Sequence, residues 1–158
     1  MTDVKHSARP SILLIEDNSD DAMLLQHAFK AANCTNPLRV VQTEDEAEQY
    51  LSGADKYSDR KQHPLPILIF LDLNLYQGDG LSLLKWIRQQ PEISRIPVIV
   101  LTASEQPNDI KQAYALGANS YMVKPIGHDM LVRMVEASKR YWLTLNIYPP
   151  VSPFPLRF

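Results

Sequence analysis

Five short apolar segments, each followed directly by a polar or charged side chain, are the feature that most restricts the fold of this chain. Most of them carry no position that could face water. Strands of this kind are typical of a parallel sheet that is buried on both faces. The segments cover residues 12–15, 38–41, 67–71, 97–101 and 120–123.

Between these segments, apolar residues recur at spacings of three and four, which predicts amphipathic helices. In the first of them, Ala22, Leu25 and Phe29 share one face, and Asn18 or Ser19 is available as the N-cap. The expected helices cover residues 20–32, 43–53, 80–90, 107–117 and 128–143, while residues 54–66 are expected to form a surface loop. Because parallel strands need crossover connections, this alternation predicts a doubly wound α/β sheet covered on both faces.

Length, charge and cysteine content narrow the class of protein. The 158 residues are 45% apolar, enough for one sizeable core, and the net charge of -2 gives no general attraction to nucleic acid or to an anionic membrane. Cys34 is a single cysteine, and no apolar run approaches the roughly 20 residues that span a bilayer. We expect a cytoplasmic protein with a polar arm at 1–10, one domain at 11–145 and a Pro-rich tail at 146–158.

The carboxyl ends of the strands are where functional groups collect in a doubly wound sheet. That edge is expected to bring together three acids, one hydroxyl and one amine, namely Glu16, Asp17, Asp72, Thr102 and Lys124. Each of them alone is commonly a cap or a solvated charge, but their joint placement at one sheet edge indicates a site.

Clustered carboxylates repel one another unless a cation neutralises them, and Mg²⁺ prefers oxygen ligands. Asp17 and Asp72 can supply carboxylate ligands, and Glu16 can hold a metal-bound water. The backbone carbonyl of Asn74 is close enough in sequence to add another oxygen. The sequence therefore predicts a magnesium site formed by these four residues.

The same layout suits the transfer of a phosphoryl group to a carboxylate. Asp72 would be the attacking group, and the metal would neutralise charge on the transferred group. Lys124 and Thr102 would hold its oxygens. We therefore expect Asp72 to be the phosphoacceptor.

Four motifs at successive strand ends resemble the response-regulator receiver domains of two-component systems. They are ILLIED at 12–17, ILIFLD at 67–72, VIVLTA at 98–103 and SYMVKP at 120–125. The resemblance covers about residues 11–140. It implies a flavodoxin-like five-stranded sheet in the order 2-1-3-4-5, forming a single receiver domain.

The resemblance also implies roles for particular residues. Asp72 would receive phosphate from a sensor histidine kinase, and Ala103 would lend a backbone N–H to the phosphoryl group. Thr102 and Tyr121 would form a switch pair, and a cis peptide would join Lys124 to Pro125. Receivers usually have proline where this chain has Tyr76, so we expect a less rigid loop there and a side chain available to a partner.

Within the receivers, three regions look like the stand-alone regulators paired with phytochrome photoreceptor kinases. They are the long loop before residue 67, the segment 113–125 and the segment Tyr141-Trp142-Leu143. This narrower resemblance implies a homodimer built through the fourth and fifth helices, and a bacteriophytochrome or cyanobacterial phytochrome as the kinase.

Two other classes of protein share this type of sheet. A phosphatase with an aspartyl-phosphate intermediate would normally need a second acid as general acid close after Asp72, where this chain has Asn74. A flavin-binding domain would need a phosphate-cradling loop after residue 15, where Glu16 and Asp17 would repel phosphate unless metal were present. We therefore expect a phosphoacceptor that signals through protein–protein interaction rather than an enzyme.

Overall fold

The computed structural model describes residues 9–150, and its core is a five-stranded parallel sheet in the order β2-β1-β3-β4-β5. The strands are β1 (Ile12–Ile15), β2 (Leu38–Val41), β3 (Leu68–Leu71), β4 (Val98–Thr102) and β5 (Ser120–Val123). The helices are α1 (Ser19–Ala31), α2 (Glu44–Ser52), α3 (Gly80–Gln89), α4 (Pro107–Ala115) and α5 (His128–Ser138). The predicted elements and strand order are confirmed, with small shifts at the element ends.

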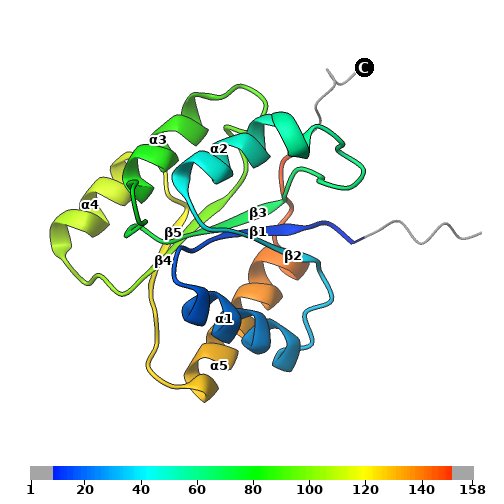
Figure 1. Ribbon diagram of the computed structural model, residues 1–158. Coiled ribbons are helices and arrows are strands. Elements are labelled where there is room, and N and C mark those ends of the chain that lie inside the picture. The colour runs from blue at the N-terminus through cyan, green and yellow to red at the C-terminus, as the bar shows by residue number, and fades with distance from the viewer. Residues whose placement is uncertain (1–8, 151–158) are drawn as a thin grey trace, which may run out of the picture.

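The helices form two layers around the sheet. Figure 1 shows α1 and α5 on one face and α2, α3 and α4 on the other. Alternate side chains of one strand enter opposite layers: Leu13 packs in the cluster beneath α2 and α3, and Leu14 packs in the cluster beneath α1 and α5. Every residue of β1, β3 and β4 is buried, which explains why these segments carry no water-facing position.

Local signals in the sequence set the helix ends near the functional edge. Asn18 caps α1, because its side-chain oxygen accepts a hydrogen bond from the Asp21 N–H at 3.0 Å. The hydroxyl of Thr43 caps α2 in the same way. At the other end of α2, Gly53 adopts the left-handed conformation with φ of 72°.

The segment between α2 and β3 is more ordered than the predicted surface loop. A 3-10 turn at Asp55–Tyr57 buries the ring of Tyr57, whose hydroxyl donates to Glu46 Oε1 at 2.8 Å. Arg60 donates to the carbonyls of Tyr50 and Leu51 at the end of α2. The predicted surface loop is confirmed at residues 58–66, whereas the 3-10 turn and the contacts back to α2 were not predicted, because local composition does not reveal them.

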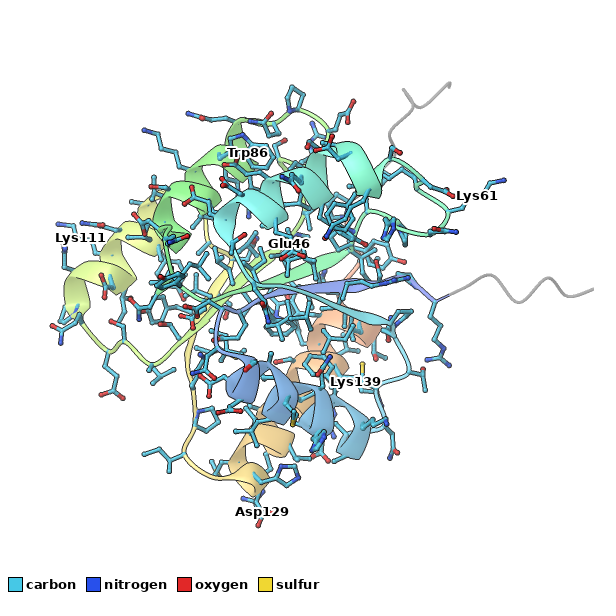
Figure 2. The ribbon with its side chains drawn as sticks, viewed as in Figure 1. Glu46, Lys61, Trp86, Lys111, Asp129 and Lys139 are labelled. Carbon is cyan, nitrogen blue, oxygen red and sulfur yellow. The ribbon has the colours of Figure 1, made fainter. Side chains whose placement is uncertain are left out.

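The last helix continues in a different geometry from the predicted one. After α5, residues Lys139–Leu145 form a π-helical segment. Figure 2 shows Lys139 facing α1, and its Nζ donates to the carbonyls of Ala32 and Asn33 at the end of that helix. No helix within residues 9–150 is both long and apolar enough to cross a membrane.

The predicted cis peptide at Lys124–Pro125 is wrong. All peptide bonds between described residues are trans. The trans isomer of an X–Pro bond is favoured by about 0.5 to 1 kcal/mol. With the trans bond in place, the Lys124 side chain contacts Glu16 and Asp72. Most of the expected N-terminal arm and the second half of the expected tail lie outside the described residues.

Candidate phosphoacceptor and metal site

The acids come together because β1 and β3 are neighbouring parallel strands in register. Ile15 pairs with Leu71, so the next residues of each strand, Glu16 and Asp72, leave the sheet side by side. The Asp72 N–H donates to the Ile15 carbonyl at 3.0 Å. One carboxylate oxygen from each of Glu16, Asp17 and Asp72 lies within 4.8 Å of the others. The predicted three-acid cluster is therefore formed.

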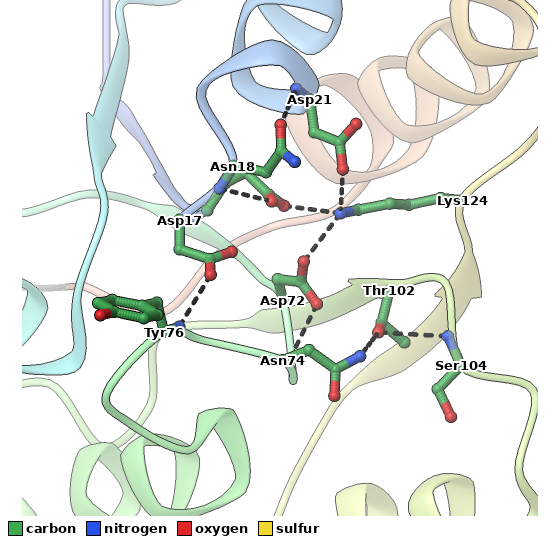
Figure 3. Close-up of polar contacts among 10 residues, drawn as sticks. Asp17, Asn18, Asp21, Asp72, Asn74, Tyr76, Thr102, Ser104 and Lys124 are labelled. Atoms are coloured by element: carbon green, nitrogen blue, oxygen red, sulfur yellow. Dashed lines mark hydrogen bonds and ion pairs between the residues drawn. The ribbon is translucent and has the colours of Figure 1, made fainter.

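Lys124 is the cation at the centre of this cluster (Figure 3). Its Nζ lies 2.8 Å from Glu16 Oε2 and 2.8 Å from Asp72 Oδ2. It also lies 3.1 Å from Asp21 Oδ2, on the first turn of α1. Asp21 is not among the acids that the sequence analysis assigned to the site. Its position one turn after the strand-end acids was the signal that could have placed it in the site.

The burial of these groups shifts their protonation. Glu16 is 1% exposed, and burial, acting with the nearby Asp72, raises its pKa to about 7 despite the hydrogen bond from Lys124. Burial acts to lower the pKa of Lys124, but the hydrogen bonds to Asp72 and Glu16 outweigh it and raise that pKa above its ordinary value. The lysine therefore stays charged and is the cation that faces the buried acids.

Both oxygens of Asp72 already have partners. Oδ1 accepts from the Asn74 N–H at 3.1 Å, and Oδ2 accepts from Lys124 Nζ. Thr102 is fully buried at the end of β4, and its hydroxyl oxygen accepts from Asn74 Nδ2 at 3.5 Å and from the Ser104 N–H at 3.4 Å. Asn74 thus links the acceptor to the hydroxyl, which its predicted role as a carbonyl ligand did not include.

The remaining predicted residues lie on the β4 and β5 side of the site. Ala103 directly follows Thr102 and is exposed. Tyr121 packs against the buried cluster of Leu73, Val100 and Ala113, and its hydroxyl donates to the Ser104 carbonyl at 2.9 Å. In this structure the aromatic ring is therefore tied to the loop that follows Thr102.

The loop between β3 and α3 approaches the cluster from the other side. The Tyr76 N–H donates to Asp17 Oδ2 at 2.8 Å, while the Tyr76 side chain is 68% exposed. The Asp79 N–H donates to Glu44 Oε2 at 2.9 Å, which ties the same loop to α2. These two contacts hold the loop that was expected to be less rigid, and no local pattern indicated either of them.

The donor set suits a hard divalent cation. It consists of three carboxylates from two strand ends, with the Asn74 backbone close by, and magnesium is usually bound by one or two carboxylates with waters. Asp17 is only half-buried, so the cluster is open on that side. The residues present therefore fit the predicted metal.

A doubly wound α/β sheet with a cluster of acids at its strand ends is the arrangement expected of a phosphoacceptor domain. Comparison with known families agrees with this class. The sequence model of the response regulator receiver domain matches residues 12–136. The chain belongs to the response regulator receiver family.

Two curated relatives are each 36% identical to this chain over 138 residues, 87% of its length. One is the response regulator Rcp1 of Synechocystis sp., of which 92% is covered. The other is the probable methanogenesis regulatory protein FilR2 of Methanothrix harundinacea, of which 86% is covered. The similarity therefore extends over most of each protein.

Two solved structures share both fold and sequence with this chain. The phosphorylated cyanobacterial phytochrome response regulator RcpA is 34% identical with a TM-score of 0.83, covering 90% of this chain and all of RcpA. The Mn²⁺-bound form of Rcp1 is 34% identical with a TM-score of 0.79, covering 89% of this chain and 99% of Rcp1.

Proposed function

We propose that this protein is a signalling switch that accepts a phosphoryl group on Asp72 from a sensor histidine kinase. The observation that carries the proposal is the contact of Lys124 Nζ with both Asp72 Oδ2 and Glu16 Oε2 beside Asp17. This arrangement combines a nearly buried carboxylate nucleophile, a cluster of acids that can hold a cation, and an ammonium group beside the nucleophile. Each of the three is needed for phosphoryl transfer to a carboxylate.

In the proposed reaction, a carboxylate oxygen of Asp72 forms a bond to phosphorus, and the bond between phosphorus and the donor nitrogen breaks. Lys124 leaves the carboxylate oxygen and holds an oxygen of the transferred group. The hydroxyl of Thr102 and the backbone N–H of Ala103 hold further oxygens. The new acyl phosphate adds negative charge beside Glu16, so the lysine remains the balancing cation.

We propose that Glu16, Asp17, Asp72 and the Asn74 carbonyl hold Mg²⁺. When bound, the ion supplies positive charge to the transferred phosphoryl group. The Mn²⁺-bound form of the relative Rcp1 supports a divalent cation in this family. The chain's own support is its all-oxygen donor set, which suits magnesium.

We propose a phytochrome, either bacterial or cyanobacterial, as the kinase. The support is the name of RcpA, a phytochrome response regulator that covers 90% of this chain. FilR2 has the same 36% identity to this chain as Rcp1, and its name refers to the regulation of methanogenesis. A methanogenesis pathway is therefore the competing assignment. Because a histidine kinase takes its phosphoryl group from ATP, which is found in the cytoplasm, we also propose a cytoplasmic location for this protein.

We further propose that output passes through protein–protein contacts, including a homodimer built on α4, α5 and the aromatic residues after α5. Tyr141 and Leu145 support this because they are 52% and 68% exposed on the π-helical segment, and β5 is an edge strand. Thr102 and Tyr121 would switch this surface through the loop at Ser104. The receiver unit would be 11–145, flanked by an arm at 1–10 and a tail at 146–158.

The acceptor is tested by intact-mass measurement after incubation with a small acyl-phosphate donor and Mg²⁺. Wild-type protein should gain one phosphoryl group, and Asp72→Asn should gain none. An undiminished adduct on Asp72→Asn would contradict the assignment. A purified phytochrome kinase should label the wild type in a light-dependent manner.

The dimer is tested by light scattering of the full chain with and without beryllofluoride. A monomer mass under both conditions would contradict the proposed interface. The double variant Tyr141→Ser with Leu145→Ser should lower the dimer fraction. Leu24→Ser, which removes an exposed apolar side chain from α1, should leave the dimer fraction unchanged.

A further inference from the structure

The main chain at Tyr76 contacts one of the three clustered acids. Its N–H donates to Asp17 Oδ2 at 2.8 Å, across 59 positions of sequence. Figure 3 shows the second oxygen of Asp17 turned toward Asp72. The contact uses only the backbone of residue 76, so it does not depend on the exposed phenol ring.

The loop that carries this N–H has a second anchor outside the cluster. The Asp79 N–H donates to Glu44 Oε2 at 2.9 Å, on the first turn of α2. Leu75, which directly precedes Tyr76 in the sequence, is buried. The loop is thus held at both ends, but only the Tyr76 end touches the acidic cluster.

We propose that the Tyr76 N–H is a positioning group for metal binding. By holding Oδ2 of Asp17, it fixes the rotation of that carboxylate and presents the other oxygen together with those of Glu16 and Asp72. Hydrogen bonds to the ligands of a metal generally act in this way, by orienting the ligand before the ion arrives. The inference rests on the proposed metal site and adds a residue to it.

A substitution that removes the N–H separates this role from that of the side chain. Proline is the one residue without a backbone N–H, so Tyr76→Pro deletes the hydrogen bond. Tyr76→Ala deletes the ring and keeps the N–H. Glu44→Ala loosens the same loop at its other anchor without touching Asp17, and so controls for loop mobility.

The experiment titrates Mn²⁺ into the full-length wild type and the three variants, following the electron paramagnetic resonance of free Mn²⁺. No phosphodonor is present. We expect Tyr76→Pro to bind Mn²⁺ about tenfold more weakly than Tyr76→Ala, the lower end of the effect of losing a hydrogen bond to a metal ligand. Tyr76→Ala and Glu44→Ala should stay within about twofold of the wild type, as expected for surface changes.

Equal affinity of Tyr76→Pro and Tyr76→Ala would overturn the inference. So would an equal loss in Tyr76→Pro and Glu44→Ala, because loop mobility would then explain both. Failure of the wild type to bind Mn²⁺ would instead overturn the proposed metal site. The two failures are therefore distinguishable.

A second measurement needs no variant, in case Tyr76→Pro does not fold. Amide hydrogen exchange of the wild type is recorded with saturating Mg²⁺. The Tyr76 N–H should remain protected, because the positioning role requires its hydrogen bond to persist beside the ion. Rapid exchange at Tyr76 while the Asp79 N–H stays protected would mean that the metal breaks the contact, and would overturn the inference.

Discussion

The Nζ of Lys124 lies 2.8 Å from Oδ2 of Asp72, although the two residues are 52 positions apart. The pair joins the end of β5 to the end of β3, across the intervening strand β4. Asp72 is 5% exposed and Glu16 beside it is 1% exposed, and both of these nearly buried acids contact the same ammonium group. The stability of the acceptor site therefore depends on a single cation.

Removal of that cation should destabilise the fold. We expect Lys124→Ala to lower the free energy of unfolding by about 3 kcal/mol without Mg²⁺, since breaking a buried ion pair leaves uncompensated charge. Asp21→Asn, which removes only the exposed partner of the lysine, should cost less than about 1 kcal/mol. Urea unfolding measures both values, and equal losses would contradict the central role given to the lysine.

Divalent metal should stabilise the wild type. At a Mg²⁺ concentration about 100 times the dissociation constant, the free energy of unfolding should rise by about 2.7 kcal/mol, because the ion binds only the folded state. Asp17→Asn removes a carboxylate of the cluster and should lose most of this gain. Thermal unfolding with Mg²⁺ and with a chelator tests this, and an unchanged gain in Asp17→Asn would remove that residue from the proposed ligands.

Gly80 should tolerate no side chain. A Cβ at this position would collide with the Asp72 carbonyl oxygen and would lie 2.6 Å from Leu73 Cα, both of them backbone atoms that cannot rotate away. We expect Gly80→Ala to displace the start of α3 and to cost about 2 kcal/mol or more. It should also weaken metal binding, because the displaced backbone belongs to the acceptor.

Gly78→Ala is the matched control for that change. Its added Cβ would lie 2.8 Å from Glu44 Oε2, which can rotate away, and 2.9 Å from Glu44 Cβ, which moves only with the backbone of α2. No backbone atom stands in the way, so the loss in unfolding free energy should be smaller than at Gly80, about 1 kcal/mol. Denaturant unfolding of both alanine variants measures the difference. A greater loss at Gly78 than at Gly80 would contradict the close approach described for Gly80.

The hydrogen bond of Tyr57 to Glu46 should give the stability an alkaline pH dependence. Burial first, and then this carboxylate acceptor, raise the pKa of Tyr57 to about 12, above its ordinary value near 10. A folded-state pKa raised in this way gives stability that is fully present below pH of about 10 and is lost as the pH rises toward about 12. Tyr57→Phe should lack this dependence.

The measurement compares the unfolding free energies of the wild type and Tyr57→Phe. At pH 8 the wild type should be more stable by about 1 kcal/mol, the net value of one hydrogen bond. That advantage should decrease as the pH rises from about 10, the unfolded-state pKa, toward about 12. A constant difference between the two proteins across this range would contradict the raised pKa.

Much of the site could be predicted because the end of a strand can be recognised from local sequence, and the ends of parallel strands lie at one edge of the sheet. Once residues 12–15 and 67–71 were recognised as parallel strands, Glu16, Asp17 and Asp72 had to meet at one edge. For Asp21 the sequence offered only its position one turn after these acids, because its contact with Lys124 depends on where α1 packs against the end of β5. The buried Tyr57 was missed for a similar reason, since its partner lies on α2.

The loop at Tyr76 shows the limit most clearly. The sequence indicated a departure from the usual receiver pattern, and from that departure alone a less rigid loop followed. The backbone N–H groups of Tyr76 and Asp79 instead find Asp17 and Glu44, which are distant in the chain. Whether a backbone donor has a partner depends on the three-dimensional approach of another segment.

The sequence by itself determined the five strands, their covering helices and the identity of the acids at the strand ends. Apolar spacing is a local property that sets which face of each element is buried, and the doubly wound connection then leaves few arrangements. Tertiary structure alone decided which charged groups contact one another, including the three ion pairs of Lys124. It also decided that the peptide bond before Pro125 is trans. These features depend on side-chain reach and on the packing of helices against the sheet, and neither is encoded by residue spacing.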